Sequence, residues 1–187
     1  RACAKVIEDE GAARMLLVCE DITESHDLSV QLAYQATHDP LTGLVNRREF
    51  ESRLGRVLAT AHNAGDEHAL CYLDLDQFKV VNDTCGHMAG DELLRQLSSL
   101  LEQHVRKRDT LARLGGDEFA VLMEHCGLEQ AQRVAQTLLR TIAEFRYKWE
   151  ESTFAIGVSI GVVPITSHSD DVGAVMRAAD TACYVAK

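Results

Sequence analysis

Two glycines followed by two acids stand between two apolar runs near the middle of the chain. Residues 115–119 read Gly-Gly-Asp-Glu-Phe, and the flanking apolar runs are 110–114 and 119–123. Two such runs joined by a short glycine-containing segment predict a β-hairpin. Glycine lets the backbone approach a bulky anion closely, and carboxylates are oxygen ligands that Mg²⁺ prefers. The hairpin tip therefore suits a metal and a phosphate, although the pentapeptide alone also fits an ordinary acidic turn.

A second acidic cluster ends an apolar run upstream. Residues 69–76 are apolar enough for a buried strand but finish with Asp74 and Asp76, which the two-residue period of a strand places on one face. Because a buried carboxylate without a partner is costly, a metal, a lysine such as Lys79 or backbone donors must compensate them. Facing the hairpin, this strand end would form a carboxylate pocket for Mg²⁺ on a nucleotide. The alternative is surface acids at a frayed strand end.

Short sequence motifs that follow one another in a fixed order indicate which protein family the chain resembles. They occupy residues 39–44, 46–48, 74–79, 82–83, 86–87, 90–91, 113–119, 159–162, 179–180 and 184–187. Together they resemble the GGDEF family of diguanylate cyclases. The resemblance implies an α+β fold, the ferredoxin-like sandwich shared by nucleotidyl cyclases and polymerase palms, with a mostly antiparallel sheet and surrounding helices. From the order of elements we expect the helices to cover one face of the sheet.

The resemblance also implies a reaction and a metal. Two GTP molecules would condense into cyclic di-GMP and two pyrophosphates in a homodimer. Two Mg²⁺ or Mn²⁺ ions per active site would be held by Asp74, the Leu75 carbonyl, Asp117 and Glu118. The implied catalytic residues are Asp117, Glu118 and Lys79, and the base is either Asp117 or Glu118.

Substrate contacts follow from the same resemblance. The implied substrate-binding residues are Phe78, Asn82, Asp91, Gly115, Gly116 and Lys187. Lys79 and Lys187 would meet the triphosphate, and a companion arginine would lie four residues beyond Lys187. A carboxylate can accept both N–H groups of the guanine edge, which suits Asp91 with Asn82 as its partner. The alternatives are an ion pair of Lys79 with Asp76, and a first-turn helix acid at Asp91.

An inhibitory product site is implied by Arg106 and Asp109. They form an R-x-x-D pattern whose end is separated from the hairpin glycines by five residues. Arginine can stack on guanine and pair with phosphate, so this pair suits cyclic di-GMP. The alternative is a set of basic residues placed favourably at a helix end.

The amino-acid composition restricts the classes of binding partner and the cellular compartment that we expect. The net charge of −10 over 187 residues argues against a nucleic-acid polymer, whose binders usually carry a basic face. Six cysteines without C-x-x-C spacing indicate reduced core residues of a cytoplasmic protein. No apolar run is long enough to span a membrane. Because the chain begins without methionine and stops within a motif, we expect a longer parent, which could carry a membrane anchor.

Three segments are expected along the chain. Residues 1–24 resemble the C-terminal remnant of a PAS-like sensor domain, with a strand at 14–19. Residues 25–38 are expected to form a signalling linker helix that pairs with its twin, or else a solvated linker helix. Residues 39–187 form the cyclase domain. Within it we expect helices at 47–62, 89–106, 128–145 and from 172, a strand pair within 153–165, and Gly86 and Gly90 shaping a turn.

Two functional hypotheses remain. The first is an active diguanylate cyclase. The second is a catalytically silent module that binds GTP or cyclic di-GMP and regulates an attached domain, such as a phosphodiesterase of the EAL type. A different nucleotide cyclase or polymerase on the same palm is disfavoured by Asp91 and the acidic surface.

Overall fold

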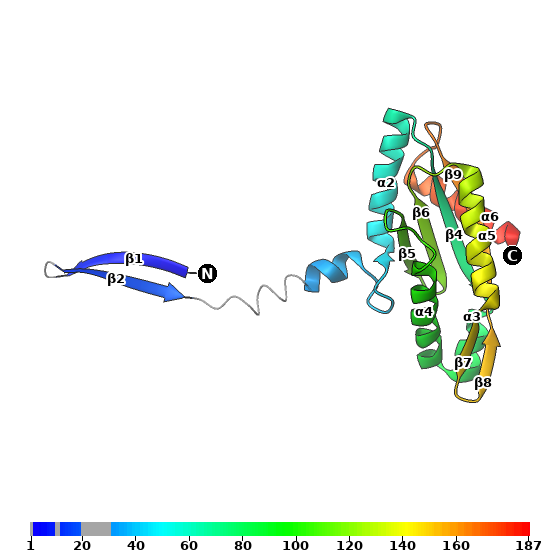
Figure 1. Ribbon diagram of the computed structural model, residues 1–187, viewed down its shortest axis with the longest axis horizontal. Coiled ribbons are helices and arrows are strands. Elements are labelled where there is room, and N and C mark those ends of the chain that lie inside the picture. Colours follow the sequence, from blue (N-terminus) through cyan, green and yellow to red (C-terminus); the bar gives the residue numbers. More distant parts are fainter. Residues whose placement is uncertain (1, 10–11, 20–30) are drawn as a thin grey trace. The chain divides into compact units, whose positions relative to one another are not determined.

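A computed structural model describes residues 2–9, 12–19 and 31–187 (Figure 1). The chain divides into two compact units, residues 1–36 and 37–187. In the first unit, β1 (Ala2–Asp9) and β2 (Ala12–Cys19) form an antiparallel hairpin, and the strand expected at 14–19 is confirmed. Residues 31–37 are helical, as expected for the end of the linker helix. The start of that helix and the expected end of the sensor remnant lie outside the described residues.

The second unit is built on a five-stranded mixed sheet. Its strand order is β3-β5-β6-β4-β9, and only β3 and β5 run parallel. The strands are β3 (Val45–Asn46), β5 (Thr110–Gly115), β6 (Glu118–Met123), β4 (His68–Asp76) and β9 (Gly157–Ile165). This mostly antiparallel sheet confirms the predicted α+β class.

Helices cover both faces of this sheet, so the expectation of one covered face was wrong. The helices α2 (Arg47–Ala64) and α6 (Val172–Ala186) pack on one face. On the other face lie α3 (Phe78–Cys85), α4 (His87–Glu102) and α5 (Leu128–Glu144). The reason is visible in β4, which is buried at every position from His68 to Leu73, as a strand covered on both sides must be.

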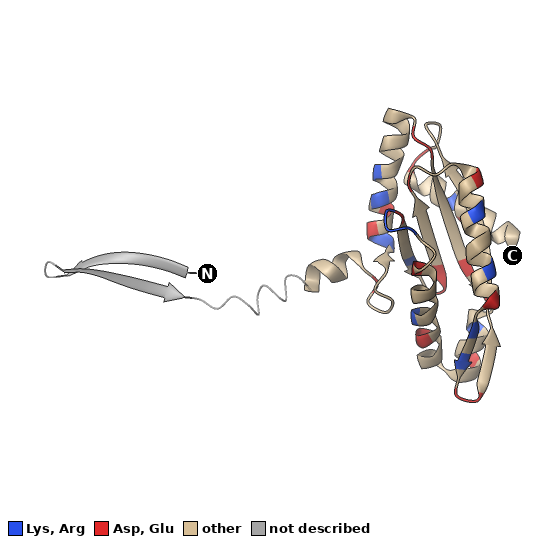
Figure 2. Ribbon diagram, viewed as in Figure 1, with Lys and Arg blue, Asp and Glu red and all other residues tan. Residues whose placement is uncertain are grey.

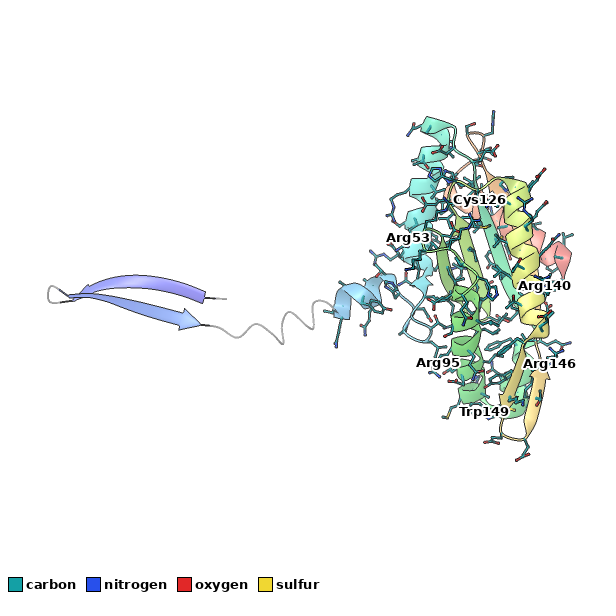
Figure 3. The ribbon with its side chains drawn as sticks, viewed as in Figure 1. Arg53, Arg95, Cys126, Arg140, Arg146 and Trp149 are labelled. Atoms are coloured by element: carbon teal, nitrogen blue, oxygen red, sulfur yellow. The ribbon has the colours of Figure 1, made fainter. Side chains whose placement is uncertain are left out.

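Other elements differ from the prediction in bounds or partners. Helix α4 ends at Glu102, before the predicted end at residue 106. Val105 continues the apolar spacing of the helix, but it packs on the same core from the segment that follows the helix. Two strands occupy the range of the expected strand pair, but they do not pair with each other, since β8 (Ser152–Ala155) pairs with β7 (Arg146–Trp149) and β9 (Gly157–Ile165) pairs with β4. The unpredicted β7 carries Trp149, which is labelled in Figure 3. The Trp149 ring stacks on Tyr147, with ring centroids 6.3 Å apart.

Helix α6 lies unusually close to β9. A Cβ atom at Gly161 would collide with the backbone of Ala179 and Cys183, so only glycine permits this approach. The buried Cys183 thiol donates to the Ser159 carbonyl at 3.1 Å. This contact fixes the end of α6 beside the end of β4.

The chain before β3 is tied to the tip of the β5–β6 hairpin by one arginine. Arg113 Nη1 donates to both carboxylate oxygens of Asp39 at 3.0 and 3.1 Å, and its Nε and Nη2 donate to the Gly116 carbonyl at 3.0 and 2.9 Å. Thr42 donates to Asp39 Oδ1 through its amide at 2.9 Å and its hydroxyl at 2.7 Å. Burial alone would raise the pKa of Asp39, but the Thr42 and Arg113 bonds outweigh it and lower that pKa.

Two further properties concern membranes and thiols. Among the described helices, none has the length and apolarity needed to cross a bilayer.

The four cysteines of residues 31–187 are unpaired thiols, and three of them are buried: Cys71, Cys126 and Cys183. For these residues the expected reduced core cysteines are confirmed.

The Asp39 carboxylate should contribute measurably to stability. We expect Asp39→Asn to lower the free energy of unfolding by about 1–3 kcal/mol, the usual range for losing bonds to a partly buried charge. Because the folded pKa of Asp39 is lowered, the contribution is complete above the unfolded carboxyl pKa of about 3.9. It is lost as pH falls through the folded pKa.

Urea unfolding at pH 7 and at pH 3 measures this effect. The matched control is Glu92→Gln, which breaks an exposed pair with Arg95 at 3.3 Å and should cost less than about 0.5 kcal/mol. Equal losses for both variants at pH 7 would contradict the role assigned to Asp39.

Candidate functional site

The two acidic segments meet at one end of the sheet. The β4–β6 register places Asp74 directly opposite Glu118, so both side chains lie on the face that carries α2 and α6. The Leu75 amide donates to the Asp117 carbonyl at 3.3 Å. Figure 2 shows acidic residues at the ends of these adjacent strands. The sheet thus brings together the residues predicted as metal ligands.

Each strand-end acid has a specific partner. Lys187 Nζ donates to Asp74 Oδ1 at 2.7 Å, and Ser159 Oγ donates to Asp76 Oδ1 at 2.9 Å. The bond to Asp74 raises the pKa of Lys187 above its ordinary value, and the charges of Asp76 and Asp117 raise it further. The strand end is therefore a negative cluster that attracts one cation even without a ligand.

Lys79 stays available for a ligand. It lies exposed in the first turn of α3, which begins directly after Gln77 with its left-handed φ of 61°. Within the described residues no acid lies in ion-pair distance of its ammonium. The alternative pairing of Lys79 with Asp76 is therefore not formed here.

Glu118 is contacted by Arg47, a residue to which the sequence analysis assigned no individual role. Arg47 Nη2 lies 3.5 Å from Glu118 Oε2, and Arg47 Nε donates to the Leu114 carbonyl at 3.2 Å. Burial first, and then the neighbouring Glu118 carboxylate, raise the pKa of Tyr72. The two-residue period of β4 places Tyr72 on the face of Asp74, a signal that could have revealed its proximity.

The donor set at the strand end suits a hard divalent cation that arrives with its ligand. Carboxylate and carbonyl oxygens are the preferred donors of Mg²⁺, which usually takes one or two carboxylates together with substrate phosphates and water. In the part of the chain that the structure describes, no group of three acidic, histidine or cysteine side chains is placed to hold a metal ion by itself. The carboxylate and carbonyl oxygens at the strand end are the kind of donors that bind Mg²⁺ together with a phosphate ligand.

The glycines of the hairpin tip have conformations that other residues rarely adopt. Gly115 has φ 144° and Gly116 has φ 52°, and both are exposed. A register shift between Arg113 and Gly115 accompanies them. The tip thus presents bare backbone next to the acidic cluster, as the sequence predicted.

A second group of predicted residues gathers where α3 meets α4. A Cβ atom at Gly90 would overlap the side-chain amide of Asn82 and lie 3.2 Å from the Phe78 ring. Gly90 is buried within α4 and directly precedes Asp91. Its role is therefore to admit Asn82 and Phe78, whereas only Gly86, with φ 83°, shapes the turn. Because α4 begins at His87, Asp91 lies in the second turn of the helix. The alternative role of Asp91 as a first-turn helix acid was therefore wrong.

Arg106 and Asp109 lie apart from the acidic cluster. They occupy the loop before β5, at the opposite end of that strand from Gly115. Arg106 therefore does not end a helix, so the helix-end alternative was wrong. The Asp109 carboxylate accepts from the Glu124 amide at 3.3 Å, and burial raises its pKa. Arg106 and Asp109 also line a cavity of about 300 Å³ that His38 and Leu44 help to form.

Curated relatives with known or inferred roles match most of the chain. The probable diguanylate cyclase DgcE of Escherichia coli (strain K12) is 43% identical over 172 residues, covering 92% of this chain and 16% of DgcE. The diguanylate cyclase TpbB of Pseudomonas aeruginosa (strain PAO1) is 38% identical, covering 86% and 37%. The cyclic di-GMP phosphodiesterase PdeB of Shewanella oneidensis (strain MR-1) is 35% identical, covering 92% and 20%. The chain thus spans well under half of each relative.

Solved structures agree with the fold. The coiled coil and GGDEF domain of DgcB from Caulobacter crescentus, solved with c-di-GMP, has a TM-score of 0.81 at 28% identity, covering 88% of this chain and 87% of that one. The FimX GGDEF domain from Pseudomonas aeruginosa has a TM-score of 0.77 at 28% identity, covering 80% and 93%. The family model described as "Diguanylate cyclase, GGDEF domain" matches residues 36–187. The chain therefore belongs to the GGDEF family and is homologous to diguanylate cyclases.

Proposed function

We propose that residues 39–187 form an active diguanylate cyclase that condenses two GTP into cyclic di-GMP and two pyrophosphates. The observation that carries the proposal is the pairing of Asp74 with Glu118 at the end of β4. The Phe78, Asn82 and Gly90 cluster follows within the next helices. A phosphate-binding end and a base-binding end are thus joined by α3.

The reaction poses a problem of charge and alignment, because a 3′-hydroxyl must attack the α-phosphate of another GTP. Two Mg²⁺ or Mn²⁺ ions bound with the nucleotide would neutralise the triphosphate and assist the departure of pyrophosphate. Asp74, Asp117, Glu118 and the Leu75 carbonyl would hold them, and either Asp117 or Glu118 would accept the hydroxyl proton. Lys79 and Lys187 would bind the phosphates as point charges.

Guanine selection would rest on Asp91 and Asn82. A carboxylate at Asp91 can accept both donors of the guanine edge, which adenine does not offer as a pair. The Asn82 amide would be held by its contact with Gly90.

The proposed reaction requires two copies of the domain. Each copy would bind one GTP, and both 3′-hydroxyls would have to face the other α-phosphate, so a homodimer forms the complete centre. We propose that residues 25–38 help to align the copies downstream of a PAS-like remnant at 1–24. Cyclic di-GMP would inhibit by binding at Arg106 and Asp109, whose loop lines a cavity of about 300 Å³.

The second candidate is a silent binding module attached to another domain. It is favoured by the similarity to PdeB, a cyclic di-GMP phosphodiesterase. Against it stands the presence in this sequence of every predicted catalytic and metal-binding side chain: Asp74, Lys79, Asp117 and Glu118.

Turnover of GTP by the dimeric protein distinguishes the two candidates. With Mg²⁺ we expect cyclic di-GMP and pyrophosphate, and Asp117→Ala should reduce the rate by about 100-fold or more, since several kcal/mol of transition-state stabilisation depend on the bound ions. The matched control is Glu151→Ala, which removes an acid from the tip of the β7–β8 hairpin. GTP binding without product in a proven dimer would reject the cyclase and leave the binding module.

The variant Gly90→Ala tests whether Asn82 contributes to guanine recognition. The added methyl group would displace Asn82, so we expect the KM for GTP to rise about tenfold, as for losing a bond to a buried polar group. The preference for GTP over inosine triphosphate, which lacks the 2-amino donor, should shrink as well.

The control for Gly90→Ala is Gly55→Ala in α2, where a Cβ atom would meet only Val172 at an ordinary 3.7 Å. Alanine should stabilise that helix by up to about 1 kcal/mol and leave the KM unchanged. An unchanged KM in Gly90→Ala would remove Asn82 from base recognition.

A further inference from the structure

The proposed base-binding end of the site is formed by two helices that begin without side-chain caps. Within the described part of the chain, neither the start of α3 at Gln77 nor the start of α4 at Gly86 has a side-chain cap hydrogen bond. By contrast, the side chain of Asn46 caps α2 and that of Asp171 caps α6. A helix start without a side-chain cap is less stable. The position of the helix starts at this end therefore depends on tertiary contacts.

Apolar packing gives the first turn of α4 little support. His87 and Met88 are exposed, and only the small residues Ala89 and Gly90 are buried. The large buried side chains of the helix begin at Leu93. Because the stabilisation from burial grows with the apolar area buried, Ala89 and Gly90 contribute little. A directional bond to this turn would therefore have a large effect on its position.

Tyr147 supplies such a bond from the β7–β8 hairpin. Its hydroxyl donates to the Ala89 carbonyl at 2.6 Å, across 58 positions of the chain. The hairpin lies at the end of the domain where α3 meets α4 (Figure 1). Burial raises the pKa of Tyr147 to about 12, so the phenol keeps its proton at neutral pH and acts as a donor.

The Tyr147 ring is itself held on both sides. It is fully buried, and the centroids of the Trp149 and Phe154 rings each lie 6.3 Å from its own. The β7–β8 register also pairs Tyr147 directly with Phe154. Aromatic rings at such distances attract one another beyond the effect of burial. Tyr147 is thus a stiff side chain on an element that is separate from α3 and α4.

We infer that Tyr147 is a positioning residue that fixes the first turn of α4 and, through it, the contact of Gly90 with Asn82. Gly90 directly follows Ala89, and the Asn82 amide occupies the space that a Cβ atom at Gly90 would fill. The inference rests on the proposed function, because it takes this junction as the place where guanine binds. Since Tyr147 is 0% exposed, it acts on the nucleotide only through Ala89.

The variant that tests this inference is Tyr147→Phe, which removes only the hydroxyl group. The probes are the Mg²⁺ complexes of two nucleotides, GTP and ATP, each with a methylene bridge between its α- and β-phosphates, so that neither releases pyrophosphate. Adenine lacks the paired donors of guanine, so the ATP analogue reports the phosphate contacts without the base contacts.

Calorimetry on the dimeric protein gives both affinities. We expect Tyr147→Phe to weaken binding of the GTP analogue about three- to tenfold, because losing one net hydrogen bond lowers the fraction of the protein that is competent to bind guanine. The affinity for the ATP analogue should stay unchanged. In turnover, the KM for GTP should rise by the same factor without a change in kcat, as for a loss of ground-state binding.

The matched control is Ser98→Ala, which removes another buried hydroxyl from α4, one that donates to the Leu94 carbonyl at 2.7 Å. Ser98 lies about two turns beyond Gly90, so this variant should keep the wild-type ratio of the two affinities. Replacing Tyr147 by 4-aminophenylalanine returns a donor to the same place and should restore the affinity for the GTP analogue.

The outcomes separate the inference from the proposed function. An unchanged ratio in Tyr147→Phe, with a wild type that prefers the GTP analogue, would overturn the role of Tyr147 alone. Equal losses of both affinities would show a general structural role and would also contradict the inference. A wild type that binds neither analogue, or binds both equally, would overturn the proposed guanine-specific function and this inference together.

Discussion

The antiparallel pairing of β4 with β6 is the interaction on which the candidate site depends. Its register places Asp74 opposite Glu118, and a slip of one residue would turn one of the two side chains to the other face of the sheet. The register is well determined because both strands are buried on both faces, so a slip would also misplace the whole core. The stability of the sheet and the geometry of the acidic cluster therefore have the same origin.

The remaining parts of the site are brought to this strand end by two glycines. Gly161 lets α6 approach β9, and Lys187 at the end of this helix reaches Asp74. Gly90 lets Asn82 lie against α4. The ion pair of Lys187 with Asp74 also has a chemical consequence, because a cation delivered with a nucleotide would compete for Asp74. We propose that Lys187 then exchanges the carboxylate for the triphosphate, which conserves the charge balance of the cluster.

Much of this arrangement could be predicted from the sequence, and the misses have physical causes. The hairpin at Gly115 and the acidic end of β4 were predictable because glycine spacing and apolar runs are local signals. The covering of both faces was missed although the unbroken apolar run of β4 indicates it. Helix α3 is short and begins after the left-handed Gln77, and the role of Gly90 depends on contacts between two helices. The contact of Arg47 with Glu118 depends on tertiary packing that residue spacing does not predict.

We propose that Asp74 and the hairpin acids jointly hold a metal ion on the phosphates of GTP. The most direct measurement is a crystal structure with Mn²⁺ and a GTP analogue that has a methylene bridge between its α- and β-phosphates, in which anomalous scattering locates the ion. We expect Mn²⁺ to be bonded to Asp74 and to Asp117 or Glu118, with Lys187 on the phosphates and guanine at Asp91. An ion remote from Asp74, or a bound nucleotide with Lys187 still on Asp74, would contradict it.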